Sequence, residues 1–178
     1  IADDHPFALG MTGFWGTTFI NDTTRNADLI LALGTRFAEA DASSWENEYT
    51  FDIPKTKLIH IDIDPSEIGR NYPAEIGVVA DLRETLKVMN RVAKQLYPNG
   101  RQNDELKQKI SAYRADFQAD NKEHCISDAF PMTPQRILQD VREVLPRNGI
   151  ITTDVGWNKN GVGQQFPVYE PGTVLTPG

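Results

Sequence analysis

Short apolar runs alternate with amphipathic helical patterns in the first part of the chain. Residues 27–34 contain five apolar positions in a row and end with glycine. An unbroken run of this kind is typical of a strand buried on both faces of a parallel sheet. Residues 57–64 predict a second, β-branched strand that ends before Pro65, because proline cannot donate to a sheet ladder. Residues 76–80 predict a third, shorter strand.

Helical spacing follows the third predicted strand. From residue 81, apolar residues recur every three or four positions until a Pro-Asn-Gly turn at 98–100, which predicts an amphipathic helix. Asp64 is followed by proline and, three residues on, by Glu67, so we expect a helix cap and a short helix or helical turn there. Strands that alternate with helices predict an α/β fold with a parallel sheet.

The chain changes character near residue 98. Residues 98–132 predict a polar linker with one charged helix, followed by a loop at 120–131. Thr133 then precedes proline and an apolar periodicity, which predicts a capped helix, and residues 150–155 predict a strand. The turn-rich segment 171–178 predicts neither helix nor strand. We therefore expect three parts, namely residues 1–97, 98–132 and 133–178, cut from a longer protein.

Composition narrows the classes of function. The chain has 178 residues, and 39% apolar content is enough to fill the core of one ordinary domain. Its 25 acidic and 18 basic residues give a net charge of −7, which repels the phosphates of nucleic acids and anionic lipids, so we expect neither partner. No apolar run approaches the roughly 20 residues of a membrane span, and no signal peptide opens the chain, so we expect a cytoplasmic protein.

Histidine and cysteine offer little chemistry. The single cysteine, Cys125, excludes an internal disulfide, and three scattered histidines form no zinc-type ligand set, so no metal site is predicted. His60 alternates with isoleucines in a predicted strand, which favours a core histidine over a catalytic one. We interpret His124 and Cys125 as structural.

Polar residues follow the predicted strands. Asp62, Asp64 and Asp81 lie at carboxyl ends of parallel strands, where open α/β sheets bind ligands and a carboxylate can accept both hydroxyls of a ribose. Asp64 is better explained as a helix cap, whereas for Asp62 and Asp81 a ligand role and a structural role weigh equally. Arg36, two residues beyond a strand end, either pairs with a phosphate or lies in solvent.

Two glycine-containing segments could let a ligand approach the backbone. Residues 10–16 have glycines three apart, which either permit close approach or supply positive φ angles. Gly156 opens a predicted loop after a strand, where a diphosphate could meet amide groups and Asn158 could donate. We find no serine nucleophile elbow, P-loop lysine or acid/base pair. The residues alone indicate a nucleotide-binding type of α/β domain joined to part of another.

Residues 4–178 resemble thiamine-diphosphate-dependent enzymes of the acetolactate synthase group. The likeness rests on short motifs in that family's order and spacing: Asp-His-Pro at 4–6, Leu-Gly-Met-Thr-Gly-Phe-Trp-Gly-Thr at 9–17, Asn-Ala-Asp at 26–28, Leu-Gly-Thr-Arg-Phe at 33–37, His-Ile-Asp-Ile-Asp-Pro at 60–65, Glu-Ile-Gly at 67–69, Ala-Asp at 80–81 and Ile-Ile-Thr-Thr-Asp-Val-Gly at 150–156. The resemblance implies an incomplete Rossmann-like central domain of the NAD/FAD-binding type, then the start of a thiamine-diphosphate-binding α/β domain.

The resemblance also implies binding residues. The positions that match diphosphate contacts of the cofactor are Val155, Gly156, Trp157, Asn158 and Gly178. In family members that keep FAD, the matching positions are Gly10, Met11, Trp15, Gly34, Thr35, Arg36, Asp62, Ile63 and Asp81. The carboxylates would take the adenosine end of that flavin. None of these residues is expected to be catalytic, because the family's activating glutamate lies in a domain outside this sequence.

Some residues depart from the acetolactate synthase pattern. Trp15 replaces a usual histidine, residues 38–40 replace Asp-Asp-Arg, and Trp157-Asn158 replaces Gln-His. These departures leave glyoxylate carboligase, sulfoacetaldehyde acetyltransferase or a related carboligase as alternatives.

The resemblance implies a larger enzyme than this chain. The complete protein would be a homo-oligomeric transferase or lyase that uses thiamine diphosphate and Mg²⁺ on a 2-oxo acid. The Gly-Asp-Gly motif that ligates the magnesium is absent from the sequence, so the chain alone is expected to be inactive. The remaining alternatives are a non-catalytic nucleotide-binding module and a scaffold that has lost its nucleotide.

Overall fold

The computed structural model describes residues 1–176 of the chain. These residues fall into two compact units, Thr12–Gln102 and a second unit of Ile1–Met11 with residues 103–176. The division into a central-domain part at 1–97, a linker at 98–132 and the start of a further domain at 133–178 stays a prediction.

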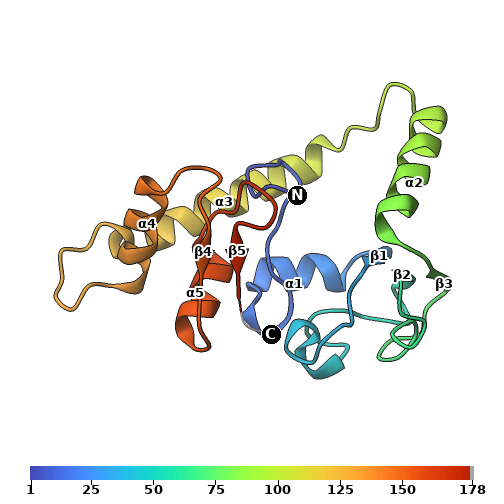
Figure 1. The fold of residues 1–178 in the computed structure, drawn as a ribbon, viewed down its shortest axis with the longest axis horizontal. Coiled ribbons are helices and arrows are strands. Elements are labelled where there is room, and N and C mark those ends of the chain that lie inside the picture. Colours follow the sequence, from blue (N-terminus) through green and yellow to red (C-terminus); the bar gives the residue numbers. More distant parts are fainter. Residues whose placement is uncertain (177–178) are drawn as a thin grey trace. The chain divides into compact units, whose positions relative to one another are not determined.

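The unit Thr12–Gln102 contains a parallel three-stranded sheet. Its elements are η1 (Gly13–Trp15), α1 (Thr18–Arg25), β1 (Leu29–Leu33), η2 (Ala40–Trp45), β2 (Lys57–Asp62), β3 (Ile76–Val79) and α2 (Leu82–Leu96). Figure 1 labels the α-helices and the strands among them. The strands lie in the order β1-β2-β3 and all pair in parallel. The predicted strands and the helix after residue 81 are therefore confirmed, and so is the α/β class.

Aromatic rings fill the core of this unit on one side of the sheet. The buried cluster consists of Ala32, Phe37, Ala42, Phe51, Ile53, Leu58 and Tyr72. The Phe37 ring lies nearly perpendicular to those of Phe51 and Tyr72, with centroid separations of 5.5 and 5.2 Å. Edge-to-face packing of this kind adds to the stabilisation that area burial supplies.

The expected burial of the first strand on both faces is wrong. Ala32 of β1 is 4% exposed, whereas Leu29 is 51% exposed and Leu31 is 39% exposed. Successive strand residues point to opposite faces, so the aromatic cluster covers one face of β1 and leaves the other partly open. An apolar run indicates that both faces can be buried, and it does not show that both are covered.

The second unit combines three helices with a short parallel pair of strands. Its elements are α3 (Asp104–Cys125), α4 (Pro134–Val144), β4 (Ile151–Thr152), α5 (Trp157–Gln165) and β5 (Val174–Leu175), with β4 paired to β5 (Figure 1). Thr133 caps α4 as predicted, because its hydroxyl accepts from the Arg136 N–H at 3.3 Å. Ile110, on the predicted apolar face of α3, is 1% exposed.

Three predictions for this unit need correction. Residues 120–125 belong to α3 rather than to a loop, because they are polar but hold no glycine or proline that would end the helix. The strand predicted at 150–155 is only two residues long. The segment predicted to lack regular structure contains β5, whose pairing with β4 depends on a distant part of the chain.

Candidate functional site

Three predicted binding segments meet at the carboxyl edge of the sheet. The Gly34 N–H donates to the Ile61 carbonyl at 2.9 Å, just beyond β1, and the Ala80 N–H donates to the Asp62 carbonyl at 3.0 Å, just beyond β3. These bonds place the Gly34 loop, Asp62 and the Ala80-Asp81 turn side by side. Open α/β sheets bind ligands at this edge.

The loop after β1 requires its glycine. Gly34 has a φ of +61°, and a Cβ there would lie 2.6 Å from Cδ1 of Leu82 in the first turn of α2. The loop therefore packs closely on the start of α2, which a larger residue at this position would prevent. Arg36 is exposed, and its guanidinium forms no ion pair with any described residue.

The buried His60 side chain holds this loop through a hydrogen bond to its backbone. Its side chain is 1% exposed, its Nε2 lies 2.9 Å from the Thr35 carbonyl oxygen, and its ring meets Phe37 edge-on at 5.4 Å. A carbonyl can only accept, so Nε2 is the protonated nitrogen that donates. The prediction of a hydrogen-bonded core histidine is confirmed.

The three carboxylates at the edge have different local partners. Oδ1 of Asp62, a residue 8% exposed, accepts from the Asp64 N–H at 2.9 Å. Asp64 accepts from the Ser66 hydroxyl and N–H, which lowers the pKa of its carboxyl, so its predicted capping role in a turn is confirmed. Asp81 caps α2, since its Oδ1 accepts from the Glu84 N–H at 3.0 Å.

Asp62 and Asp81 each keep one carboxylate oxygen available. Their hydrogen bonds use Oδ1, and Oδ2 of neither residue receives a donor from the described residues. Ile63, between Asp62 and Asp64, is 70% exposed at the same edge. The edge thus offers two acceptor oxygens beside an exposed apolar side chain.

The residues of the glycine segment divide between the two units. Gly10, with a φ of +107°, and Met11 belong to the unit that contains α5, where a Cβ on Gly163 would collide with the Met11 sulphur. Trp15 belongs to the sheet unit and meets Phe14 edge-on at 4.6 Å. Met11 and Trp15 therefore each have a packing role within their own unit.

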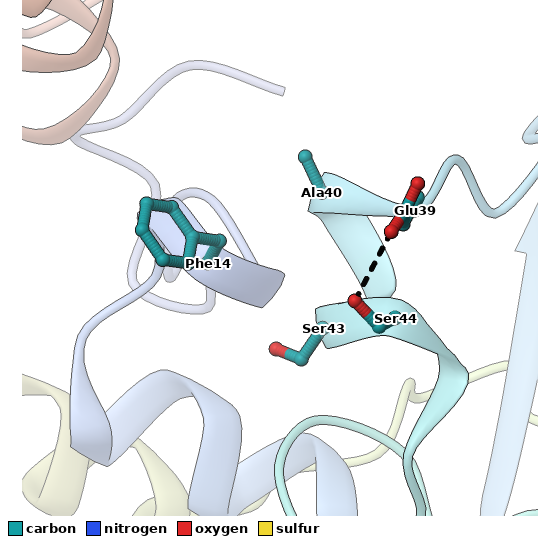
Figure 2. Close-up of a pocket in the computed structure, with 5 residues that line it drawn as sticks. All are labelled: Phe14, Glu39, Ala40, Ser43 and Ser44. Atoms are coloured by element: carbon teal, nitrogen blue, oxygen red, sulfur yellow. Dashed lines mark hydrogen bonds between the residues drawn. The ribbon is translucent and has the colours of Figure 1, made fainter.

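A cavity of about 330 Å³ lies beside η2, and sequence reasoning did not single it out as a site. Its lining consists of Phe14, Glu39, Ala40, Ser43 and Ser44 (Figure 2). The Ser44 hydroxyl donates to Oε1 of Glu39 at 3.3 Å. Ser43, Ser44 and Trp45 all have positive φ angles, between +48° and +61°. Non-glycine residues rarely adopt this conformation, so no sequence signal predicts the shape of this segment.

The segment after β4 begins a helix rather than a loop. Gly156, with a φ of +130°, is the N-cap of α5, and Trp157 and Asn158 form the first helical turn, which corrects the predicted loop. As a glycine, the N-cap offers no side-chain acceptor to the first-turn N–H groups, and phosphate-binding helices begin in the same way. Val155 is 73% exposed beside them, whereas Gly178 lies outside the described residues.

Metal and membrane features can be stated for residues 1–176. No group of three or more His, Cys, Asp or Glu side chains there is arranged to hold a metal ion. Among the helices in that part of the chain, none has the length and apolarity needed to cross a membrane.

The fold and its edge define a class of protein. A parallel sheet followed by helices, with acidic residues and a glycine turn at its carboxyl ends, is a Rossmann-like α/β domain. The family described as the central domain of thiamine pyrophosphate enzymes matches residues 1–89, which is half of the chain. The chain belongs to this family of thiamine-pyrophosphate-dependent, acetolactate synthase-like proteins.

Similar proteins come from archaea, plants and bacteria. A probable acetolactate synthase large subunit of Methanocaldococcus jannaschii is 35% identical, with 99% of this chain and 29% of that protein aligned. Acetolactate synthase 1, chloroplastic, of Zea mays is 31% identical over 94% of this chain and 25% of its own length. Acetolactate synthase isozyme 1 large subunit of Escherichia coli is 29% identical over 98% of this chain and 29% of its own length. The chain spans less than a third of these relatives.

Proposed function

We propose that this chain is part of a thiamine-diphosphate-dependent carboligase or decarboxylase that acts on 2-oxo acids. The names of the similar proteins support acetolactate synthase-like chemistry. Within that enzyme, the sheet unit supplies a nucleotide site and α5 supplies contacts to the cofactor's diphosphate. The complete protein is proposed to be a cytoplasmic homo-oligomer, and this chain alone is proposed to be inactive.

The nucleotide site rests on one observation, the meeting of the Gly34 loop, Asp62 and Asp81 at the sheet edge. The backbone amides of the Gly34 loop and the exposed Arg36 guanidinium suit a diphosphate. The second oxygens of Asp62 and Asp81 suit ribose hydroxyls. FAD and ADP share both groups, so either fits these residues.

The thiamine diphosphate contacts rest on the N-terminus of α5. Gly156 adopts a backbone conformation that favours glycine, and the first-turn amides of Trp157 and Asn158 suit a phosphate. Thiamine diphosphate, when bound, supplies the carbanion chemistry by which such enzymes act on 2-oxo acids. These residues would hold the cofactor's anionic end, and we propose that Mg²⁺ is ligated by residues outside this chain.

A second candidate function is a scaffold without nucleotide. The scaffold is favoured by the structural roles of the two acidic residues, because Asp62 orders the turn after β2 and Asp81 caps α2. Both roles would keep these carboxylates in place even if no ligand bound.

A thermal-shift titration with FAD and ADP separates the two candidates. We expect both ligands to raise the melting temperature of the chain, because a ligand that binds only the folded state stabilises it. The shift should be lost in Asp62→Ala and kept in the matched variant Asp116→Ala, on exposed α3. Absence of any shift in the unmodified chain would favour the scaffold. Thiamine diphosphate with Mg²⁺ is titrated separately to test α5.

A further inference from the structure

Three side chains anchor three successive carbonyls of the loop after β1. His60 donates to the Thr35 carbonyl at 2.9 Å, and Trp45 Nε1 donates to the Phe37 carbonyl at 2.7 Å. Asn71 Nδ2 lies between them, donating to the Arg36 carbonyl at 2.9 Å and to the Phe37 carbonyl at 3.2 Å. The donors come from β2, from η2 and from the segment between β2 and β3.

This anchoring decides where the loop amides point. In a planar trans peptide the C=O and the following N–H point in opposite directions. The carbonyls of Thr35 and Phe37 face the anchors, so the N–H groups of Arg36 and Ala38 face away from them. Neither N–H donates to any acceptor in the part of the chain that the structure describes. Two outward amides beside the Arg36 guanidinium form a site for an anion.

We infer that Asn71 is a positioning residue that, by holding the Phe37 carbonyl, aims the Ala38 amide at the phosphates of a nucleoside diphosphate. His60 holds the Thr35 carbonyl and so aims the neighbouring Arg36 amide. This inference rests on the proposed nucleotide site. Asn71 bridges two adjacent carbonyls with one amide nitrogen, which holds Phe37 at its unusual φ of +47°. It touches no ligand itself, and its effect is confined to the phosphate end, because Asp62 and Asp81 are placed by other bonds.

The test compares ADP with adenosine on the full chain. Asn71→Leu keeps the size of the side chain and removes its donors without adding charge. We expect it to weaken ADP binding about tenfold, the effect of losing one or two hydrogen bonds, and to leave adenosine binding within about twofold. Asn71→Gln, which retains an amide donor, should restore most of the ADP affinity. Asn90→Leu, the same change on exposed α2, should alter neither affinity. Calorimetry measures the affinity for ADP, and NMR titration measures the affinity for adenosine.

The outcomes separate this inference from the proposed function. If the unmodified chain binds neither ADP nor FAD, both are wrong. If it binds ADP and Asn71→Leu binds it equally well, or loses ADP and adenosine together, only the positioning role is wrong. One measurement needs no variant, namely the amide shifts of Arg36 and Ala38 in the unmodified chain during ADP addition. We expect both to move, and ADP binding that leaves the Ala38 amide unmoved overturns the inference even if Asn71→Leu does not fold.

Discussion

Tyr72 shows how burial changes the chemistry of a single residue. The side chain is 3% exposed within the aromatic cluster, and its hydroxyl has no hydrogen-bond partner among the described residues. Because burial disfavours the charged phenolate, the pKa of Tyr72 is raised to about 12. A buried hydroxyl without a partner also costs free energy in the folded state.

We expect Tyr72→Phe to be neutral or stabilising by up to about 1 kcal/mol at pH 7, since it removes the buried hydroxyl. Tyr72 ionises near pH 10 when unfolded and near 12 when folded, so its contribution to stability is complete below pH 10 and falls as the pH rises through 12. Urea unfolding at pH values from 8 to 11 should therefore show that the free energy of unfolding falls less with rising pH in Tyr72→Phe than in the unmodified chain. An identical pH dependence in the two proteins would contradict this.

Helix caps explain why the elements begin where they do. Asp81, Asn103 and Thr133 each accept a backbone N–H in the first turn of α2, α3 or α4. Each cap satisfies a donor that the helix itself leaves unpaired. Asp81 is of special interest because the same side chain is a candidate nucleotide acceptor.

We expect Asp81→Ala to lower the free energy of unfolding by about 1 kcal/mol, because the Glu84 N–H loses its acceptor. Asp81→Ser should recover most of this loss, since serine is a good N-cap. The measurement is urea unfolding followed by circular dichroism. Asp116→Ala, in the interior of α3, serves as the control and should be neutral or slightly stabilising. Equal stability of the two alanine variants would show that the cap contributes nothing.

At the scale of the whole molecule, single residues join segments far apart in sequence. The Arg114 guanidinium on α3 donates to the carbonyls of Asp3, His5 and Ala8, at 2.8, 2.8 and 2.6 Å. These bonds hold Ile1–Met11 in the same compact unit as α3. All three contacts are made by the single nitrogen Nη2, and such charge-assisted bonds are stronger than neutral ones.

We expect Arg114→Lys to loosen the N-terminal segment, because the lysine ammonium lies one bond closer to the backbone than Nη2 and falls short of the three carbonyls. Hydrogen exchange of the Asp3 and Ala8 amides should be about tenfold faster, which corresponds to about 1.4 kcal/mol of local stability. Arg91→Lys, an exposed position on α2, is the matched control and should leave this exchange unchanged. Unchanged protection in Arg114→Lys would show that other contacts hold the segment.

The candidate site was predictable in part. Asp62 and Asp81 follow apolar strands, and a parallel sheet brings its carboxyl ends to one edge, so their meeting could be inferred. The anchoring by Trp45 and Asn71 could not, because it depends on side chains 8 and 34 residues from Phe37. The cavity beside η2 was also beyond prediction, since it depends on left-handed residues that sequence does not signal.

Local physics determined the class of fold, the strands, most helix starts and the motifs of the family, because periodicity, capping and turn chemistry act between near neighbours along the chain. Tertiary structure alone decided which face of β1 is covered, that β4 pairs with β5 and where the loop amides of Arg36 and Ala38 point. Those features depend on contacts between segments whose separation along the chain carries no local signal.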